Sequence, residues 1–227
     1  MRKIFLLGSS SYLIQEIGRY LLKDKKYEVI FISRKKINKF ENSKHYKTDY
    51  STTSISKIFK KELNKKAHKP IIIFGNVITQ SELFINIDEK FINNIINVNI
   101  ILPIRVVNIV LKNYFRASPI FFNISSIRVN PSVGTSIYGS SKLFMENFFG
   151  NLALEYGNMD CIFKSIRIGI SDGGLAKTLS DKVIKAHFQR LAKKDFVKPL
   201  EIYKTIEFEL ERSSSNGKVV YCDNGYF

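Results

Sequence analysis

At 227 residues, the chain is long enough for one substantial α/β domain with a full core and short for two. Its 44% hydrophobic content is that of a globular protein, and because no apolar run reaches membrane-spanning length we expect no membrane span. Cys161 and Cys222 are too few for a disulfide framework or a metal set, and the first apolar run is too short for a signal peptide. These features indicate a cytoplasmic protein without a metal site.

The net charge of +16 has three possible explanations: lysines on solvent-exposed helix faces, attraction of an anionic small ligand, or nucleic-acid binding. The basic residues are scattered over helix ends and loops, without the interleaved aromatic residues of a surface that stacks bases. We therefore expect no nucleic-acid partner and at most a bias toward anionic small molecules.

Strand-like apolar runs alternate with helical patterns along the chain, which predicts a mainly parallel sheet wrapped by helices. The predicted strands lie at 2–7, 27–33, 45–49, 70–75, 119–124, 161–168 and 218–222. The predicted helices lie at 12–22, 51–66, 89–115, 136–156 and 180–192, and Pro103 predicts a kink or a break in the third of them. This order is that of a single doubly wound α/β domain with about seven strands.

The turn after the first predicted strand begins with Gly8 and continues through Ser10 and Ser11 into a helix. Glycine allows a tight turn there, and small residues let backbone N–H groups and a helix N-terminus approach a pyrophosphate. Only the first of the glycines expected in such a loop is present, so an ordinary strand-to-helix turn is the alternative.

The second predicted strand ends in Ser33, followed by Arg34 and two lysines. Dinucleotide folds that select NAD place a carboxylate near this point, whereas those that select NADP accommodate the 2′-phosphate with arginine. No carboxylate lies between Phe31 and Phe40, which favours NADP(H) over NAD(H). The alternative is a solvated basic turn.

Tyr138 and Lys142 stand four residues apart in a predicted helix, twelve residues and more after the pair Ser125 and Ser126. Residues at this spacing share one helix face, and a cation beside a phenol lowers its pKa from about 10 toward working pH. A tyrosine so placed can exchange a proton with a carbonyl or an alcohol. A surface tyrosine with a solvated lysine neighbour is the alternative.

Taken together in this order, the motifs resemble the short-chain dehydrogenase/reductase family over nearly the whole chain. Strand 119–124 with its two serines resembles the strand that ends in the family's catalytic serine, and Tyr138 to Lys142 resembles its catalytic helix. Further pieces that fit are Asp49 after the third strand, Phe74-Gly75-Asn76, Asn97-Val98-Asn99, Arg167-Ile168-Gly169 and Asp223-Asn224-Gly225.

The resemblance implies a Rossmann-type oxidoreductase in which hydride transfer reduces a carbonyl or oxidises an alcohol. Tyr138 would be the general acid or base, Lys142 would hold the cofactor ribose, Ser126 would stabilise the oxyanion, and Asn99 would position a water; Ser125 is the alternative to Ser126. The residues implied to bind the cofactor are Gly8, Ser10, Ser11, Tyr12, Leu13, Ser33, Arg34, Asp49, Tyr50, Phe74, Gly75, Asn76, Tyr138, Lys142, Gly169 and Ile170. For Asp49, a helix N-cap is the alternative.

Two departures from the family pattern bear on function. Ser11 and Ile14 replace glycines, and a β-branched side chain at Ile14 is expected to weaken or shift cofactor binding. The chain also lacks the C-terminal substrate region of extended members, so residues 171–199 are expected to cover the substrate.

The substrate is expected to be a small metabolite, anionic or a nucleotide-linked sugar. The competing hypotheses are a nucleotide-sugar epimerase or dehydratase, and a cofactor-binding sensor or scaffold without turnover. By resemblance, helices 89–115 and 136–156 would pair copies of the chain into a homodimer or homotetramer.

Overall fold

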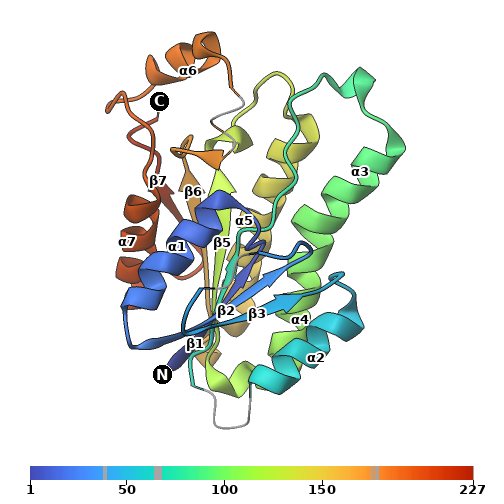
Figure 1. The fold of residues 1–227 in the computed structure, drawn as a ribbon, viewed down its shortest axis with the longest axis vertical. Helices are drawn as coiled ribbons and strands as arrows, with labels where there is room; N and C mark the ends of the chain where they lie inside the picture. The colour runs from blue at the N-terminus through green and yellow to red at the C-terminus, as the bar shows by residue number, and fades with distance from the viewer. Residues whose placement is uncertain (38–39, 64–67, 175, 177–178, 227) are drawn as a thin grey trace.

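The strands of the described chain form one parallel sheet in the order β3-β2-β1-β4-β5-β6-β7 (Figure 1). The structure is a computed structural model that describes residues 1–37, 40–63, 68–174, 176 and 179–226. The strands are Arg2–Leu7 (β1), Tyr27–Ser33 (β2), Ser43–Lys47 (β3), Ile71–Phe74 (β4), Ile120–Ser126 (β5), Ile162–Ile168 (β6) and Val219–Cys222 (β7). The predicted doubly wound α/β fold is thus confirmed.

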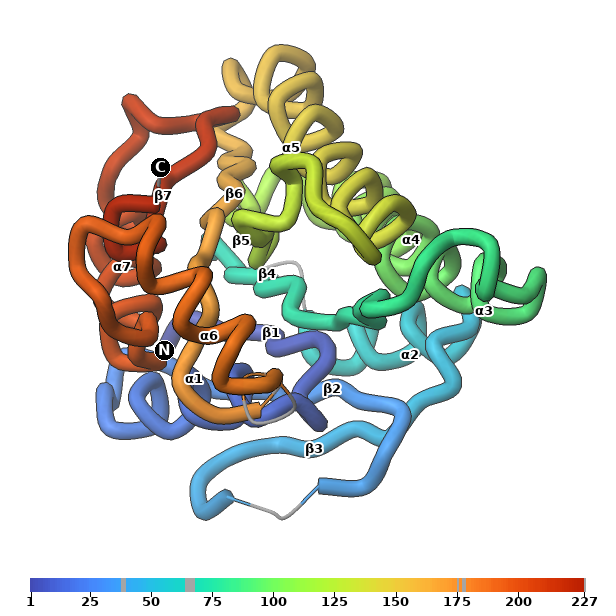
Figure 2. The backbone as a smooth tube through the Cα atoms, turned by 90° about the horizontal axis from the view of Figure 1, so that it is seen from above, coloured from blue at the N-terminus to red at the C-terminus, as the bar shows by residue number. Residues whose placement is uncertain are grey.

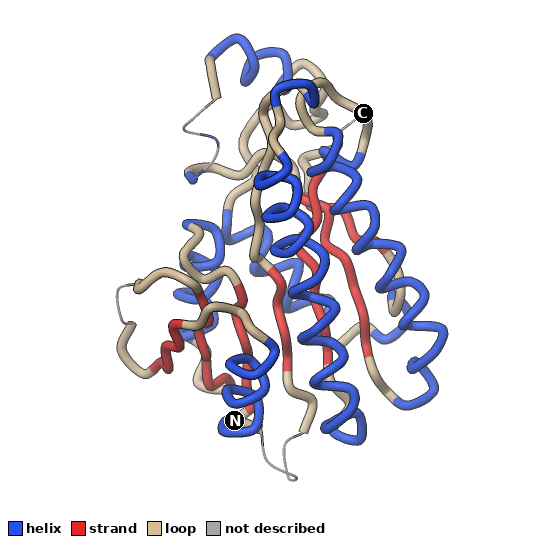
Figure 3. Tube along the Cα trace, turned by 90° about the vertical axis from the view of Figure 1, so that its right-hand side faces the viewer, coloured by secondary structure: helices blue, strands red, loops and turns tan. Residues whose placement is uncertain are grey.

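Helices cover both faces of the sheet (Figure 3). They are Tyr12–Lys23 (α1), Thr52–Glu62 (α2), Glu89–Ile96 (α3), Leu102–Tyr114 (α4), Ser136–Tyr156 (α5), Asp181–Phe188 (α6) and Pro199–Leu210 (α7). Side chains alternate along each strand, so in β1 Phe5 and Leu7 pack in one cluster with α2, α4 and α5, whereas Ile4 and Leu6 pack in another with α1 and α7. Burial on both faces explains the nearly continuous apolar runs of the central strands.

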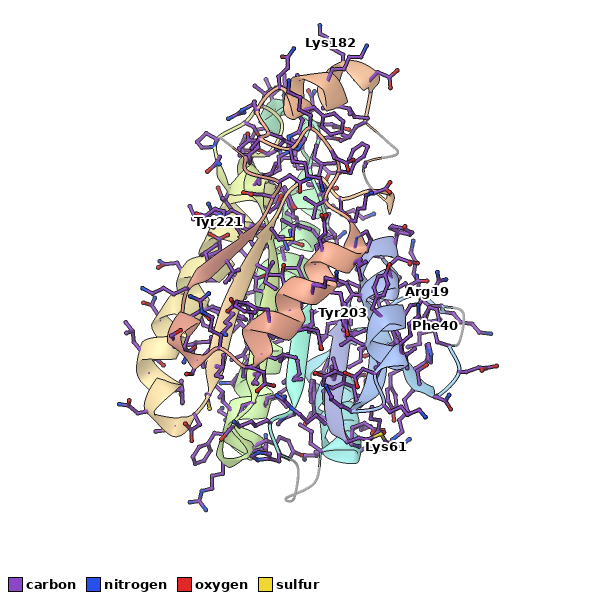
Figure 4. All side chains as sticks on the ribbon, turned by 90° about the vertical axis from the view of Figure 1, so that its left-hand side faces the viewer. Arg19, Phe40, Lys61, Lys182, Tyr203 and Tyr221 are labelled. Atoms are coloured by element: carbon purple, nitrogen blue, oxygen red, sulfur yellow. The ribbon has the colours of Figure 1, made fainter. Side chains whose placement is uncertain are left out.

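The two outer helices of one face lie side by side. Tyr20 of α1 stacks on Tyr203 of α7, with ring centroids 5.5 Å apart, and in Figure 4 Tyr203 lies beside the helix that carries Arg19. Helix α7 was not predicted, although Pro199 opens it and Ile202, Ile206 and Leu210 recur every four residues on its buried side.

The long helical region differs from the prediction at Pro103. Instead of a kink or break there, residues Asn97–Ile101 form a π-helical turn, and Pro103 lies in the first turn of α4, where its missing N–H costs little. The whole stretch Glu89–Ala117 is, among the described residues, the one helix whose length and apolar composition would allow it to cross a membrane. Its most apolar window is 56% buried against the fold, as in a core helix.

Two other predicted elements are displaced. The third strand begins and ends two residues earlier than predicted, and the second helix ends at Glu62, while residues 64–66 of its predicted range lie outside the described part. The fifth strand extends through both Ser125 and Ser126, so both serines lie at its carboxyl end. Helix α6 lies over that end of the sheet, as Figure 2 shows from above.

Candidate functional site

A cleft of about 460 Å³ opens at the carboxyl ends of β1 and β4. These adjacent strands connect to helices on opposite faces of the sheet, and this is where doubly wound sheets bind ligands. The cleft is lined by Gly8, Ser10, Ser11, Arg34, Lys35, Tyr50, Gly75, Asn76, Val77 and Val98.

Gly8 makes the tight turn that brings α1 to the cleft. Its φ is +77°, and a Cβ there would lie 2.4 Å from the backbone of Asn76, so no other residue fits. The hydroxyl of Ser11 caps α1 by accepting from the Ile14 backbone N–H at 3.3 Å. Ser10, Ser11 and the N-terminus of α1 thus border the cleft, an arrangement suited to a phosphate group.

Ile14 does not project into the phosphate loop, contrary to the sequence-based expectation. Its side chain is 1% exposed and packs among the apolar residues under α1. A Cβ at Gly75 would lie 2.1 Å from Ile14 Cδ1, so the missing side chain at Gly75 is what makes room for Ile14. The larger residue on the helix is matched by a glycine on the neighbouring turn, and the cleft stays open.

Tyr50 and Asn76 form the polar floor of the cleft. The Tyr50 hydroxyl accepts from the Gly8 backbone N–H at 3.2 Å and donates to the Ile32 carbonyl at 3.3 Å. Asn76 donates through Nδ2 to the Val98 carbonyl, while its buried Oδ1 has no hydrogen-bond partner in the described structure. An unpaired buried acceptor beside a glycine turn and a helix N-terminus fits a bound dinucleotide.

The outer end of the cleft is basic. Arg34 and Lys35 line it, and no carboxylate occurs among its described lining residues. The Ser33 hydroxyl turns away to donate to the Lys35 carbonyl at 2.5 Å. Asp49 is exposed outside the lining; it accepts from the Ser51 N–H at 2.9 Å, which lowers the pKa of its carboxyl group, and Ser51 rather than Asp49 caps α2.

Ser126 and Tyr138 meet at the carboxyl end of β5. The phenol of Tyr138 is buried near the Ser126 side chain. Burial raises the pKa of Tyr138, while the Ser126 side chain and the positive charge of Arg128 oppose that rise. The hydroxyl of Ser125 does not point to Tyr138 but donates a hydrogen bond to Glu146 at 2.5 Å.

Lys142 lies one helical turn beyond Tyr138 and is also buried. Its ammonium donates to the Ile124 carbonyl at 2.8 Å. Burial lowers the pKa of Lys142 to about 8, against the opposing charge of Glu146. The expectation that Lys142 lowers the pKa of Tyr138 is not met in this structure: the cation acting on the phenol is Arg128, and desolvation of the phenol has the larger effect.

The helix that carries Tyr138 is held by two side chains from elsewhere. Asn99, in the π-helical turn, bonds the N–H and carbonyl of Ile78 at 2.8 and 2.9 Å and donates to the Ser141 hydroxyl at 3.1 Å. Gln80 Oε1 accepts from the backbone N–H groups of Ile137 and Tyr138 at 2.9 and 3.4 Å. These bonds connect the segment after β4 to the first turns of α5.

The other predicted site residues lie outside the cleft lining. The Phe74 side chain belongs to the core cluster with Phe121 and Phe149. Leu13, in the first turn of α1, packs against the apolar cluster beneath that helix, and the Tyr12 ring lies against Gly173. Gly169 and Ile170 follow β6 and bond Cys222 and Val197 through their backbones.

Four residues at the site were not predicted: Lys35, Val77, Val98 and Gln80. The first three are direct chain neighbours of predicted residues, which is the signal that could have found them. Gln80 is separated by more than fifty residues from the helix that it caps, so nothing local identifies it.

Comparison with known proteins assigns this arrangement to a family. The sequence profile described as "short chain dehydrogenase" matches residues 13–184. A search of curated protein sequences gave no match.

Solved structures share the fold over almost the entire length. A 4-hydroxyisoleucine dehydrogenase complexed with NADH is 18% identical with a TM-score of 0.89, covering 99% of this chain and 98% of its own. ElxO with NADP bound is 19% identical with a TM-score of 0.86, covering 99% and 98%. A short chain dehydrogenase family protein from Francisella tularensis subsp. tularensis SCHU S4 is 19% identical with a TM-score of 0.85, covering 100% and 98%.

The profile spans most of the chain, the sheet order is that of a doubly wound nucleotide fold, and a cleft that fits a dinucleotide opens at its switch point. The chain therefore belongs to the short chain dehydrogenase family of nicotinamide-dependent oxidoreductases.

Proposed function

We propose that this protein is an NADP(H)-dependent oxidoreductase that interconverts a carbonyl and an alcohol in a small metabolite, with Tyr138 as the general acid or base. The observation that carries the proposal is the group of buried side chains at the carboxyl end of β5, where Tyr138 lies near Ser126 and Lys142 lies one turn further along α5. This group lies at the same edge of the sheet as the cleft that fits the dinucleotide.

Each side chain of this group has a separate role in the proposed reaction. A bound nicotinamide would supply or accept the hydride. Tyr138, whose pKa is raised by burial, is protonated at neutral pH and so can donate its proton to the carbonyl oxygen during reduction. Ser126 would hydrogen-bond the same oxygen as negative charge develops on it. Lys142 would hold the ribose, and Asn99, bound to Ser141, would keep the π-helical turn against α5.

The preference for NADP(H) rests on the basic end of the cleft. A ribose 2′-phosphate would lie near Arg34 and Lys35, and no carboxylate of the described lining would repel it. The two fold relatives carry NADH in one case and NADP in the other, so the choice depends on these side chains rather than on the fold.

The segment over the carboxyl ends of the strands is the part of the chain that we expect to cover a substrate. Residues 171–199, of which 175, 177 and 178 lie outside the described part, include α6 above the carboxyl ends of the strands, and we assign this segment to covering the substrate. The 4-hydroxyisoleucine dehydrogenase acts, by its name, on a hydroxylated amino acid, which is consistent with a substrate of that size.

A direct test measures binding and turnover separately. NADPH and NADH are titrated into the protein while thermal stability and nucleotide fluorescence are followed, and NADPH oxidation is then measured against a panel of carbonyl compounds. We expect NADPH binding and turnover of at least one carbonyl compound. Binding without turnover would favour a sensor, and failure to bind either nucleotide would contradict the proposal.

Substitution of the tyrosine tests the mechanism. Tyr138→Phe removes the proton donor and should lower kcat by about 10²- to 10⁴-fold while leaving NADPH affinity within a few-fold. Tyr156→Phe, at the far end of the same helix, is the matched control and should keep full activity. Full activity in Tyr138→Phe would exclude this residue as the general acid.

Substitution in the basic turn tests the cofactor choice. Arg34→Ala should weaken NADPH binding about 10- to 100-fold, the range of a lost charge-assisted hydrogen bond, with little change for NADH. Lys36→Ala removes the same charge two residues away, outside the cleft lining, and should change the affinity for NADPH far less. Equal losses for NADPH and NADH in Arg34→Ala would remove the basis for NADP(H) selectivity.

We also propose a cytoplasmic homo-oligomer paired through α4 and α5. Both cysteines are free thiols, which suits a reducing compartment. Leu143, Phe144 and Leu154 on α5 are 51%, 45% and 85% exposed, an apolar surface that a second copy of the chain would bury.

A further inference from the structure

A row of polar side chains crosses three strands beneath α5. Ser125 of β5 is paired in register with Arg167 of β6, and Arg167 with Tyr221 of β7, which is labelled in Figure 4. Residues paired in register on neighbouring strands point to the same face of the sheet. Here it is the face that α5 covers, because Phe163, four residues before Arg167, packs against Phe149 of that helix with ring centroids 5.8 Å apart.

Glu146 of α5 binds two members of this row. Its Oε1 atom accepts from Ser125 Oγ at 2.5 Å and from Arg167 Nε at 3.0 Å, and its Oε2 atom accepts from Arg167 Nη2 at 2.5 Å. The side chains of Glu146 and Arg167 are 4% and 14% exposed, so solvent screens their attraction little. The Tyr221 ring supports the other side of the guanidinium, with its centre 5.0 Å from Cζ. Two parallel bonds between a guanidinium and a carboxylate fix the orientation of both groups.

The face of α5 that carries Glu146 also carries Tyr138 and Lys142. The three residues are spaced four apart, so they lie on successive turns of the helix. Lys142 donates to the Ile124 carbonyl at 2.8 Å, and Glu146 accepts from the side chain of the next residue of the same strand. Glu146 therefore connects the turn beyond Lys142 to the end of β5, about 12 Å along the helix axis from Tyr138.

The neighbouring contacts of α5 with the sheet do not determine how the helix is rotated. The other buried residues in this part of α5 are Met145, Phe149 and Leu152, and their apolar contacts have no preferred direction. A buried ion pair adds little net stability, because the loss of hydration offsets much of the attraction between its charges. The bonds of Glu146 to Arg167 are directional, however, and they are satisfied in one rotation of α5 against β5 and β6.

We propose that Glu146 and Arg167 are positioning residues of the reaction: their ion pair fixes the rotation of α5 against the sheet and thereby the places of Tyr138 and Lys142. Neither residue lines the cleft, so both act through the helix rather than on a ligand. A misplacement of a reacting group by about 1 Å can slow a reaction about 100-fold, so a small rotation of α5 is enough. This inference rests on the proposed oxidoreductase function.

Replacing the ion pair with apolar side chains of similar size separates positioning from stability. In Glu146→Met/Arg167→Met no charge is left unpaired, so the protein should fold, unfold within a few degrees of the wild type and bind one NADPH per chain. Single-turnover oxidation of that NADPH by a carbonyl compound, expressed per bound NADPH, should slow at least tenfold. The KM for the carbonyl compound should change less than kcat. A role in stability alone would change the amount of folded protein and leave this rate as it is.

A milder variant and a matched control complete the test. Arg167→Lys keeps the charge and the fold but cannot form two parallel bonds, so it should slow the same step at least threefold. Lys164→Met/Glu209→Met is the control, because it removes a second buried ion pair of β6, with side chains 0% and 1% exposed, that faces α7 instead of α5. Its single-turnover rate per bound NADPH should equal that of the wild type.

The outcomes distinguish this inference from the proposed function. A wild-type rate in Glu146→Met/Arg167→Met, or in Arg167→Lys should the double variant not fold, would overturn the positioning role. An equal loss of rate in the control would overturn it as well, because removal of any buried ion pair would then slow the reaction. In both cases the wild type still reduces a carbonyl compound, so the positioning role alone is wrong. If the wild type does not bind NADPH or does not turn over, the proposed function fails and the positioning role with it.

Discussion

Lys142 is buried in the folded protein, where a charged side chain is energetically unfavourable. It is 5% exposed, its ammonium donates a hydrogen bond to the Ile124 carbonyl, and burial lowers the pKa of that ammonium from 10.5 to about 8. Between pH 8 and 10.5 the unfolded chain therefore holds a proton that the folded chain has lost. The free energy of unfolding therefore rises with pH across that window. Below pH 8 the charged, buried Lys142 destabilises the folded state by about 3 kcal/mol.

Lys142→Met should therefore be more stable than the wild type at pH 7 and inactive. We expect a gain of about 2 kcal/mol in the free energy of unfolding, because the lost hydrogen bond to Ile124 subtracts about 1 kcal/mol. The gain should shrink above pH 8 and disappear by about pH 10.5, as urea unfolding at several pH values would show. Lys57→Met, on the exposed side of α2, is the control; a gain that did not depend on pH would contradict the argument.

Ile14 and Gly75 form a complementary pair. Because a Cβ at Gly75 would overlap Ile14 Cδ1 and Cγ1, Gly75→Ala should lower the free energy of unfolding by about 2 kcal/mol. Ile14→Ala removes both clashing atoms at the cost of a cavity, about 2–4 kcal/mol. In the double variant, the total loss in the free energy of unfolding should be about 1–2 kcal/mol smaller than the sum of the two single losses, as measured by denaturant unfolding. Additive losses would show that the two residues do not interact.

At the scale of elements, the first turn of α5 depends on a residue from the segment after β4. Thr135, the residue before this helix, makes no side-chain capping bond, whereas Gln80 accepts from the N–H groups of Ile137 and Tyr138 and donates to Ser136. Gln80 is 6% exposed. It therefore both satisfies the helix end and sets the position of Tyr138, the proposed general acid or base.

Gln80→Leu should lower the free energy of unfolding by about 1–2 kcal/mol, the range of a lost helix cap. It should reduce kcat more than it weakens NADPH binding, because the freed turn carries Tyr138 and does not line the cleft. Gln80→Glu keeps the accepting oxygen and places negative charge at a helix N-terminus, so it should retain more activity and stability than Gln80→Leu. Equal effects of the two substitutions would show that the capping bond does not matter.

At the scale of the whole molecule, the outer surface of α5 exposes the large apolar side chains Leu143, Phe144 and Leu154. We expect light scattering to show a homo-oligomer in solution. Phe144→Glu should convert it to monomer, because a charge would be buried without a partner in the paired surface. Leu200→Glu on α7, in the other helical layer and 38% exposed, should leave the assembly unchanged. A monomeric wild type at micromolar concentration would contradict the proposed pairing.

The fold class and the family could be inferred from the sequence because both depend on local patterns. Apolar runs of strand length separated by helical periods required a parallel doubly wound sheet, and the family profile and the sheet order confirm this inference. The spacing of Tyr138 and Lys142 on one helix and the serines at the end of β5 also follow from local sequence. The missed α7 is an exception, since its spacing of apolar residues was visible.

The tertiary structure decided what depends on burial and on contacts between distant segments. Desolvation raises the pKa of Tyr138, whereas the sequence suggested a decrease, because spacing along a helix says nothing of how deeply a phenol is buried. Gly75 makes room for Ile14, which the departure from the family's glycine pattern had marked as a defect of the cofactor loop. The sequence by itself thus determined the fold and the family, and it identified the side chains that we propose to react. Only the packed structure decided how deeply those side chains are buried and which distant residues support them, because these are properties of the space between segments.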